Sequence, residues 1–183
     1  MDARTGGSVK ILLSPHFDDE SLFAAYTLLR EKPLVVFCFP DVGRHGDPMV
    51  RRSESVEALG VLGCTSGEVL RTDDLREGLA NRFADVEVEH VWAPLPEPDG
   101  NSHHNIVGEL AAELWPDRVT FYATYTSEGR TTMGERVRRP DGWEALKRDA
   151  LRCYRSQMAH PWTAPHFERG LDEYLIEAEV CVG

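Results

Sequence analysis

Two short apolar runs near the N-terminus dominate the pattern of hydrophobic and polar positions. Residues 9–13 and 34–39 are almost continuously apolar and rich in β-forming side chains, which is typical of strands buried on both faces of a sheet. Between them, residues 20–30 place large apolar side chains at helical spacing. We therefore predict a strand, helix, strand unit with a right-handed crossover.

The later elements continue this alternation. In chain order we predict a helix over 51–62, strands over 68–70 and 91–93, a helix over 105–114, a strand over 119–122, a helix over 143–157 and an edge strand over 174–180. The predicted class is α/β, a Rossmann-like three-layer sandwich with a mostly parallel central sheet. The length predicts a single domain over residues 1–183, with 1–7 as a flexible tail.

Two long irregular stretches, residues 93–101 and 124–139, interrupt the alternation. Loops of this length in a compact domain are often functional. In open α/β sheets the ligand crevice lies outside the carboxyl ends of the strands. We expect the ligand site at that edge.

Composition narrows the choice of partner. The formal net charge of −11 would repel a phosphate backbone, and the basic cluster at 136–139 has no interleaved aromatic residues, so we expect no nucleic-acid partner. No apolar run approaches the roughly 20 residues that cross a bilayer, and the first residues lack a secretory signal, so we expect a cytoplasmic protein without a membrane partner.

The cysteines have no paired spacing and are expected to be buried thiols: Cys38, Cys64, Cys153 and Cys181.

The segment that follows the first predicted strand carries the clearest chemistry. It reads Ser-Pro-His-Phe-Asp-Asp-Glu over residues 14–20. His16 and Asp19 offer an imidazole and a carboxylate, a ligand set suited to zinc or another divalent ion. The alternative is that the acids only cap the helix. One acid suffices for a cap, and three consecutive acids repel each other unless a cation lies nearby, so we favour a metal site.

A catalytic zinc site needs a third protein ligand. Residues 101–105, Asn-Ser-His-His-Asn, follow a predicted strand and precede a helix, so they can face the same crevice. On spacing alone, this His pair fits a solvated polar loop equally well.

These segments resemble a known family. Residues 15–20 resemble the Pro-His-x-Asp-Asp-Glu signature of the PIG-L/LmbE-like deacetylases, which hydrolyse N-acetyl groups on amino sugars and related metabolites. Arg51 and Glu54, followed by Ala-Leu-Gly at 58–60, resemble that family's Arg-x-x-Glu helix, and residues 147–157 resemble its late Lys-helix-Ser-Gln segment. The segments occur in the family's order.

The resemblance implies a role for each matching residue. His16 and Asp19 would bind the metal, expected to be Zn²⁺ or another divalent transition metal, and Asp18 would be the general base. Arg51 would contact substrate. The family's His-x-x-His motif aligns with residues 101–104, which makes His104 the third ligand.

The sequence departs from the family within that second motif. In the family, the first His of this motif helps to stabilise the oxyanion; here Asn101 occupies that position. His103 occupies a position where the family usually has an acid. An Asn amide can donate a hydrogen bond but cannot carry charge or deliver a proton. We expect Asn101 or His103 to serve the oxyanion.

The expected function is a zinc-dependent deacetylase that acts on an N-acyl amide of an amino sugar, glycoside or related small molecule. One alternative is a metal-binding relative with weak or no activity, because the first His is missing. Another is a phosphoacceptor signalling domain, which would need a Lys near the end of the sheet, whereas Lys147 falls within a predicted helix. A homo-oligomer is compatible with all three.

Several other residues have both an ordinary and a functional interpretation. Arg51 and Glu54, one helical turn apart, would form a surface pair if the resemblance were set aside. A further group lies in polar or Pro-containing segments, where residues are more often structural or exposed but can line a substrate mouth: Tyr125, Arg130, His160 and His166.

Overall fold

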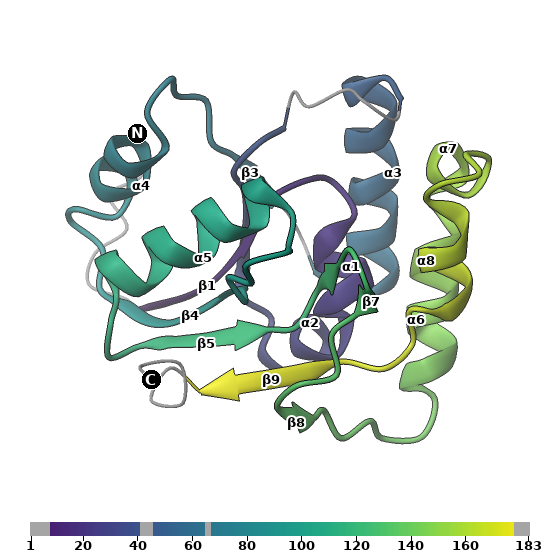
Figure 1. Cartoon of the computed structure of the whole chain (residues 1–183). Coiled ribbons are helices and arrows are strands. Elements are labelled where there is room, and N and C mark those ends of the chain that lie inside the picture. Colours follow the sequence, from purple (N-terminus) through teal and green to yellow (C-terminus); the bar gives the residue numbers. More distant parts are fainter. Residues whose placement is uncertain (1–7, 41–45, 65–66, 178–183) are drawn as a thin grey trace.

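A seven-stranded sheet forms the centre of the molecule (Figure 1). The computed structural model describes residues 8–40, 46–64 and 67–177. The strand order is β3-β2-β1-β4-β5-β9-β8, and the first five of these strands are parallel. β9 pairs antiparallel with β5, and β8 pairs antiparallel with β9. The strands are β1 (Val9–Ser14), β2 (Leu34–Phe37), β3 (Gly67–Val69), β4 (Val88–Pro94), β5 (Val119–Tyr122), β8 (Glu135–Arg136) and β9 (Tyr174–Glu177).

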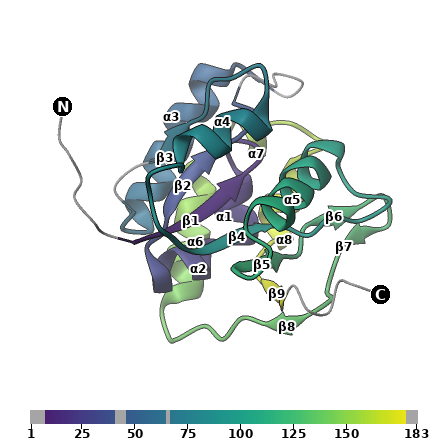
Figure 2. The same ribbon diagram turned by 90° about the vertical axis from the view of Figure 1, so that its left-hand side faces the viewer.

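Helices cover both faces of this sheet (Figures 1 and 2). Because side chains alternate along a strand, Leu12 of β1 packs into one hydrophobic cluster while Ile11 and Leu13 pack into another. The first cluster contains side chains of α1 (Asp19–Phe23), α2 (Ala25–Glu31), α3 (Pro48–Val61), α6 (Trp143–Arg152) and α8 (Ala164–Arg169). The second contains side chains of α4 (Leu75–Arg82) and α5 (Ser102–Leu114). The predicted three-layer α/β sandwich with a mostly parallel sheet is confirmed.

The strand order reverses between β1 and β4. From β1 the chain proceeds outward through β2 and β3, then returns to β4 on the other side of β1 and continues to β5. A crevice opens at such a switch point, outside the carboxyl ends of the two central strands. The segments after β1 and β4 therefore meet there, although they are far apart in sequence.

The predicted helix over 20–30 is wrong as a single element, because it breaks at Ala24 into α1 and α2. In a continuous helix the N–H of Tyr26 would donate to the carbonyl of Leu22. Here the Glu173 carboxylate accepts from the Tyr26 N–H at 3.0 Å, and Lys147 Nζ donates to the Leu22 carbonyl at 2.8 Å. A buried ion pair thus replaces the missing helical hydrogen bond.

The predicted helix over 143–157 is also divided, into α6 and α7 (Arg155–Met158). Between them Tyr154 leaves the helical region, with φ −82° and ψ 60°. Its ring is fully buried, and its hydroxyl donates to Glu20. The bend therefore follows from the anchoring of Tyr154 in the core.

Helix caps explain why two helices begin earlier than predicted. The Asp47 carboxylate accepts from the Met49 N–H ahead of α3, and Pro48 occupies the first turn. Asn101 caps α5, so both histidines lie within the helix and not in a loop before it. Val56, an apolar residue of the helix predicted over 51–62, is 62% exposed.

Several short elements were not predicted. They are the helices α4 and α8, the strand β8, and a hairpin formed by β6 (Tyr125–Thr126) and β7 (Gly129–Arg130). The strands β6, β7 and β8 all lie within the irregular stretch 124–139. The predicted edge strand over 174–180 corresponds to β9, which lies between β5 and β8 and is therefore not at the edge. Residues 178–180 lie outside the described residues.

The predicted buried thiols are confirmed for Cys38, Cys64 and Cys153, which are free and at most 8% exposed. Cys181 and the predicted tail over 1–7 lie outside the described residues. Within the described part of the chain, no helix is both long and apolar enough to span a bilayer.

Candidate metal centre

Three potential metal ligands converge at the switch point of the sheet. His16 and Asp19 come from the turn between β1 and α1, and His104 comes from the first turn of α5. Asp19 Oδ2 lies 3.0 Å from His16 Nδ1 and 3.2 Å from His104 Nε2. The ligand atoms of the three residues all lie within 4.8 Å of one another. The structure therefore brings together the three residues that the sequence proposes as ligands.

The surroundings of His104 fit a metal ion. Its side chain is fully buried, and neither ring nitrogen has a hydrogen-bond partner among the described residues. The 3.2 Å contact with Asp19 is an ion-pair distance without hydrogen-bond alignment. Two atoms that bind one tetrahedral zinc at about 2.0–2.2 Å lie roughly 3.3–3.6 Å apart. A zinc ion would satisfy the Nε2 atom that is otherwise left without a partner.

The charge state of Asp19 also suits a ligand. Burial alone would raise the pKa of this carboxyl, but the nearby charges of His104 and His16, together with the hydrogen bond to His16, outweigh burial. The net effect holds the pKa of Asp19 well below its ordinary value. Asp19 is therefore a carboxylate at neutral pH, the form that binds a cation.

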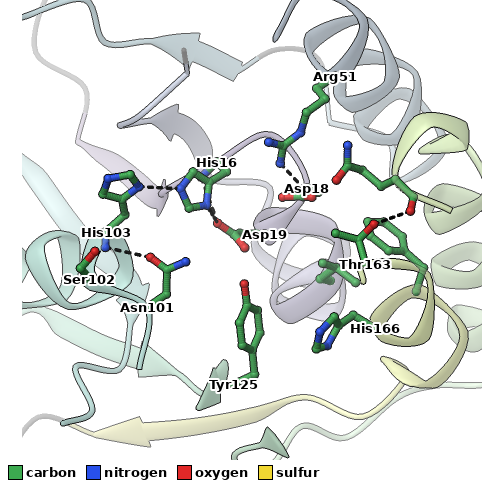
Figure 3. Close-up of a pocket in the computed structure, with 13 residues that line it drawn as sticks. His16, Asp18, Asp19, Arg51, Asn101, Ser102, His103, Tyr125, Thr163 and His166 are labelled. Carbon is green, nitrogen blue, oxygen red and sulfur yellow. Dashed lines mark hydrogen bonds and ion pairs between the residues drawn. The ribbon is translucent and has the colours of Figure 1, made fainter. Parts of the chain in front are cut away.

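Asp18 lies beside these ligands in an unusual backbone conformation. Its φ of 150° is one of two positive values among the described non-glycine residues, and such a conformation costs about 1–3 kcal/mol. Its N–H donates to Glu20 Oε2 at 2.9 Å. Its carboxylate pairs with Arg51 at 2.9 Å, as Figure 3 shows. These contacts hold the Asp18 side chain at the cavity.

The pKa of Asp18 is raised to about 7. Burial is the main cause, and the negative charge of Asp19 adds to it, while the positive charge of Arg51 opposes it. A carboxylate with a pKa near neutrality can accept and return a proton efficiently near pH 7. Asp18 therefore has the protonation properties of a general base.

A buried network supports the turn that carries Asp18. The Glu20 carboxylate is fully buried and accepts from the Ser55 hydroxyl at 2.9 Å, from the Tyr154 hydroxyl and from the Asp18 N–H. Burial raises the pKa of Glu20, and its hydrogen bonds oppose that shift. Glu20 connects the turn to α3 and to the chain after α6.

Arg51 and Glu54 do not form an exposed surface pair. Both are buried; Arg51 pairs with Asp18 and donates to the Phe17 carbonyl at 3.1 Å. Glu54 accepts from the N–H and hydroxyl of Ser156, at 2.8 and 2.6 Å. Two of the segments that resemble the family motifs, around 51–54 and 156–157, are thus in direct contact.

Asn101 divides its amide group between two tasks. The Oδ1 atom accepts from the His103 N–H at 2.9 Å and so caps α5. The side chain also lines the cavity, together with Tyr125. Because Oδ1 serves the cap, Nδ2 is the atom available to donate towards a ligand.

Gly108 sets how closely α5 approaches the sheet. A Cβ atom at this position would lie 2.2 Å from the Pro94 carbonyl oxygen and 2.7 Å from Pro96 Cγ. His104 lies one turn earlier on the same face of the helix. Because Gly108 has no side chain, α5 can lie close enough to the sheet for His104 to reach Asp19.

A cavity of about 410 Å³ opens beside the three ligands. Figure 3 shows the Tyr125 hydroxyl pointing towards Asp19 across this space. Burial raises the pKa of Tyr125 beyond its ordinary value, so the hydroxyl keeps its proton. The lining residues are His16, Asp18, Asp19, Leu22, Arg51, Asn101, Ser102, His103, Tyr125, Gln157, Thr163, His166 and Phe167.

The expectation that Tyr125 and His166 are structural or exposed is wrong, because both residues line the cavity. Their rings stack with centroids 4.8 Å apart. Arg130 instead donates to the Leu22 carbonyl at 3.0 Å, and His160 is half-buried in the chain after α7. The sequence signal for Tyr125 was its place in a long loop after a central strand.

Solved structures with the same architecture provide an independent comparison. The conserved protein TT1542 from Thermus thermophilus matches with a TM-score of 0.70 and 19% identity, over 93% of this chain and 94% of that one. A deacetylase of the teicoplanin biosynthetic pathway matches at 0.67 and 16%, over 92% and 97%. The N,N'-diacetylchitobiose deacetylase of Pyrococcus horikoshii matches at 0.62 and 16%, over 95% and 86%. The chain shares its fold with these three proteins.

A shared fold does not by itself decide the chemistry. GalB, the 4-carboxy-2-hydroxymuconate hydratase of Pseudomonas putida, matches with a TM-score of 0.61 and 18% identity, over 93% of this chain and 95% of that one. No protein-family model matches the sequence, and a search of curated proteins finds no match. The residues of the site, and not the fold, determine the reaction.

Proposed function

We propose that this protein is a zinc-dependent deacetylase that hydrolyses an N-acyl amide, most simply an N-acetyl group, on an amino sugar, glycoside or related small metabolite. The observation that carries the proposal is the convergence of His16, Asp19 and His104 beside a cavity that also contains Asp18. Two protein imidazoles and one carboxylate form a common ligand set for catalytic zinc. Deacetylases among the structural neighbours support the same reaction class.

His16, Asp19 and His104 would hold the ion. Bound zinc would supply Lewis acidity that lowers the pKa of a water and polarises the amide carbonyl. Asp18 accepts the proton of the attacking water, since its carboxyl lines the cavity beside the ligands and burial raises its pKa above the ordinary value. The same carboxyl then returns that proton to the leaving amine, so one group serves both steps.

The other residues of the cavity orient the substrate and its developing charge. Asn101 Nδ2 donates a hydrogen bond to the oxyanion, because Oδ1 is committed to the cap of α5. Arg51 orients Asp18 through their ion pair and presents its guanidinium to the substrate at the cavity wall. Tyr125 supplies a second neutral donor near Asn101.

A metal-binding relative with weak activity is the main alternative, because Asn101 cannot provide the charge of an imidazolium. The raised pKa of Asp18 and its ion pair with Arg51 favour activity, since a mere binding protein has no use for a strained, buried base. A phosphoacceptor domain is disfavoured. The Lys147 ammonium that it would need is buried against Glu173 at 2.7 Å.

The test is acetate release from N-acetylglucosamine, N,N'-diacetylchitobiose and an N-acetyl amino acid by the zinc-loaded chain. We expect turnover of at least one sugar, and a loss of about a hundredfold or more in Asp18→Asn, the usual scale for a general base. The exposed Asp117→Asn is the matched control. Release from the amino acid alone would correct the substrate class, whereas no release from any amide would favour the inactive relative.

A further inference from the structure

The outer nitrogen of His16 has a specific partner. While Nδ1 faces Asp19 Oδ2 at 3.0 Å, Nε2 lies 2.9 Å from His103 Nδ1 (Figure 3). The His16 ring is thus held at both nitrogens. Nδ1 lies on the side where the three ligand atoms converge, so Nε2 points away from them.

The chemistry of imidazole determines the direction of this second hydrogen bond. A neutral His that binds an ion through Nδ1 carries its proton on Nε2. His16 must then donate, and His103 Nδ1 must accept. A metal-binding His commonly donates its other N–H to a carboxylate, carbonyl or water. Here a second imidazole takes that place.

The structure holds the His103 ring firmly in the accepting position. The ring stacks on Phe39 with centroids 4.2 Å apart and an interplanar angle of 17°. Its backbone N–H is fixed by the cap from Asn101. The next residue, His104, is itself a ligand. The first turn of α5 therefore supplies one ligand and the partner that orients another.

We propose that His103 is a positioning residue of the metal centre, which fixes the orientation and tautomer of His16. This inference rests on the proposed metal site, and it gives His103 a role other than that of an oxyanion donor. The oxyanion is then served by Asn101. The role depends on an acceptor at the position of Nδ1, and stacking on Phe39 alone does not provide it.

Zinc affinity tests this role without reference to activity. In competition with a chromophoric chelator, we expect His103→Leu to bind zinc about 10- to 100-fold more weakly, the usual effect of losing such a partner. His103→Asn keeps an acceptor oxygen near the position of Nδ1 and should stay within a few-fold of the unaltered chain. His90→Leu, a half-buried His bonded to Thr120, is the control and should bind normally.

Nitrogen-15 NMR of the unaltered, zinc-loaded chain gives a second measurement that no folding defect can confuse. We expect His16 to show a metal-bound Nδ1 and a protonated Nε2 that exchanges slowly with water. Protonation at Nδ1, or a His103→Leu affinity equal to that of the unaltered chain, would overturn the inference and leave the metal site standing. Failure of the unaltered chain to bind zinc would overturn both.

Discussion

The neighbours of Asp18, the proposed general base, determine its protonation. Its backbone is strained, its carboxyl is buried, and the guanidinium of Arg51 is its immediate partner. Burial raises the pKa and Arg51 lowers it. The balance between these two effects sets the pH at which the base is available.

Replacing Arg51 should shift the pH profile in a defined direction. As a base, Asp18 is active only when deprotonated, so kcat/KM falls as pH drops through its pKa. Arg51→Met removes the charge that lowers this pKa, and the acidic limb of kcat/KM should move to higher pH. Arg52→Met, an exposed neighbour, should leave the limb in place. An acidic limb that does not move in Arg51→Met would separate Asp18 from the titration.

The two tasks of Asn101 can be separated by substitution. Asn101→Asp keeps an oxygen that caps α5 but removes the amide donor, so kcat should fall by about 10²–10³ with stability preserved. Asn101→Ala should lose the same activity and also about 1 kcal/mol of unfolding free energy. Kinetics and urea denaturation measure the two effects. Unchanged kcat in Asn101→Asp would assign the oxyanion to another donor, with Tyr125 the nearest candidate.

At the scale of elements, α5 can pack closely against the chain after β4 because residue 108 is a glycine. Gly108→Ala would force its Cβ against the Pro94 carbonyl, 2.2 Å away in the present geometry. The helix must move, and His104 moves with it. We expect zinc affinity, measured by chelator competition, to fall by about tenfold or more, because the ligands then miss the distances that zinc requires.

Gly60→Ala is the matched control for this substitution. Nothing lies within 4 Å of a Cβ built at Gly60, in α3. Alanine there should raise the unfolding free energy by about 0.5–1 kcal/mol through helix propensity, without a change in zinc affinity. Equal zinc affinities in both variants would show that α5 does not depend on close packing at Gly108.

The break between α1 and α2 depends on the buried pair of Lys147 and Glu173. Lys147→Met leaves Glu173 charged and without its cation, which should cost about 3–5 kcal/mol of unfolding free energy. In the double variant with Glu173→Gln, the amide oxygen still accepts from the Tyr26 N–H, and more than half of the loss should return. Arg148→Met removes only an exposed pair with Glu144 and should cost less than about 1 kcal/mol. Chemical denaturation decides between these outcomes.

The strength of local sequence signals explains which elements were predictable. The central strands β1 and β2 are apolar on both faces, so the sequence marks them directly. The break at Ala24 was not predictable because its cause, Glu173, lies far along the chain. The bend at Tyr154 likewise depends on distant Glu20. Contacts between remote residues carry no local pattern.

At the scale of the whole molecule, the sheet topology brings the three candidate ligands together. His16 and Asp19 follow β1, and His104 follows β4, its neighbour in the sheet. Their meeting could be predicted, because both segments leave the same edge at the switch point. The partner of His16 and the cavity wall formed by Tyr125 and His166 could not, since they depend on side-chain directions and on a hairpin that the sequence does not mark.

The dependence of hydrolysis on bound zinc shows whether His16, Asp19 and His104 form a catalytic metal centre. Metal-free chain is titrated with zinc while kcat/KM for acetate release from its best sugar substrate is measured, with bound zinc determined in the same samples. We predict negligible activity without metal, a linear rise to one equivalent per chain and a plateau, and no such rise in His104→Ala. Full activity in the metal-free chain, or an undiminished titration in His104→Ala, would rule out the proposed zinc-dependent hydrolysis.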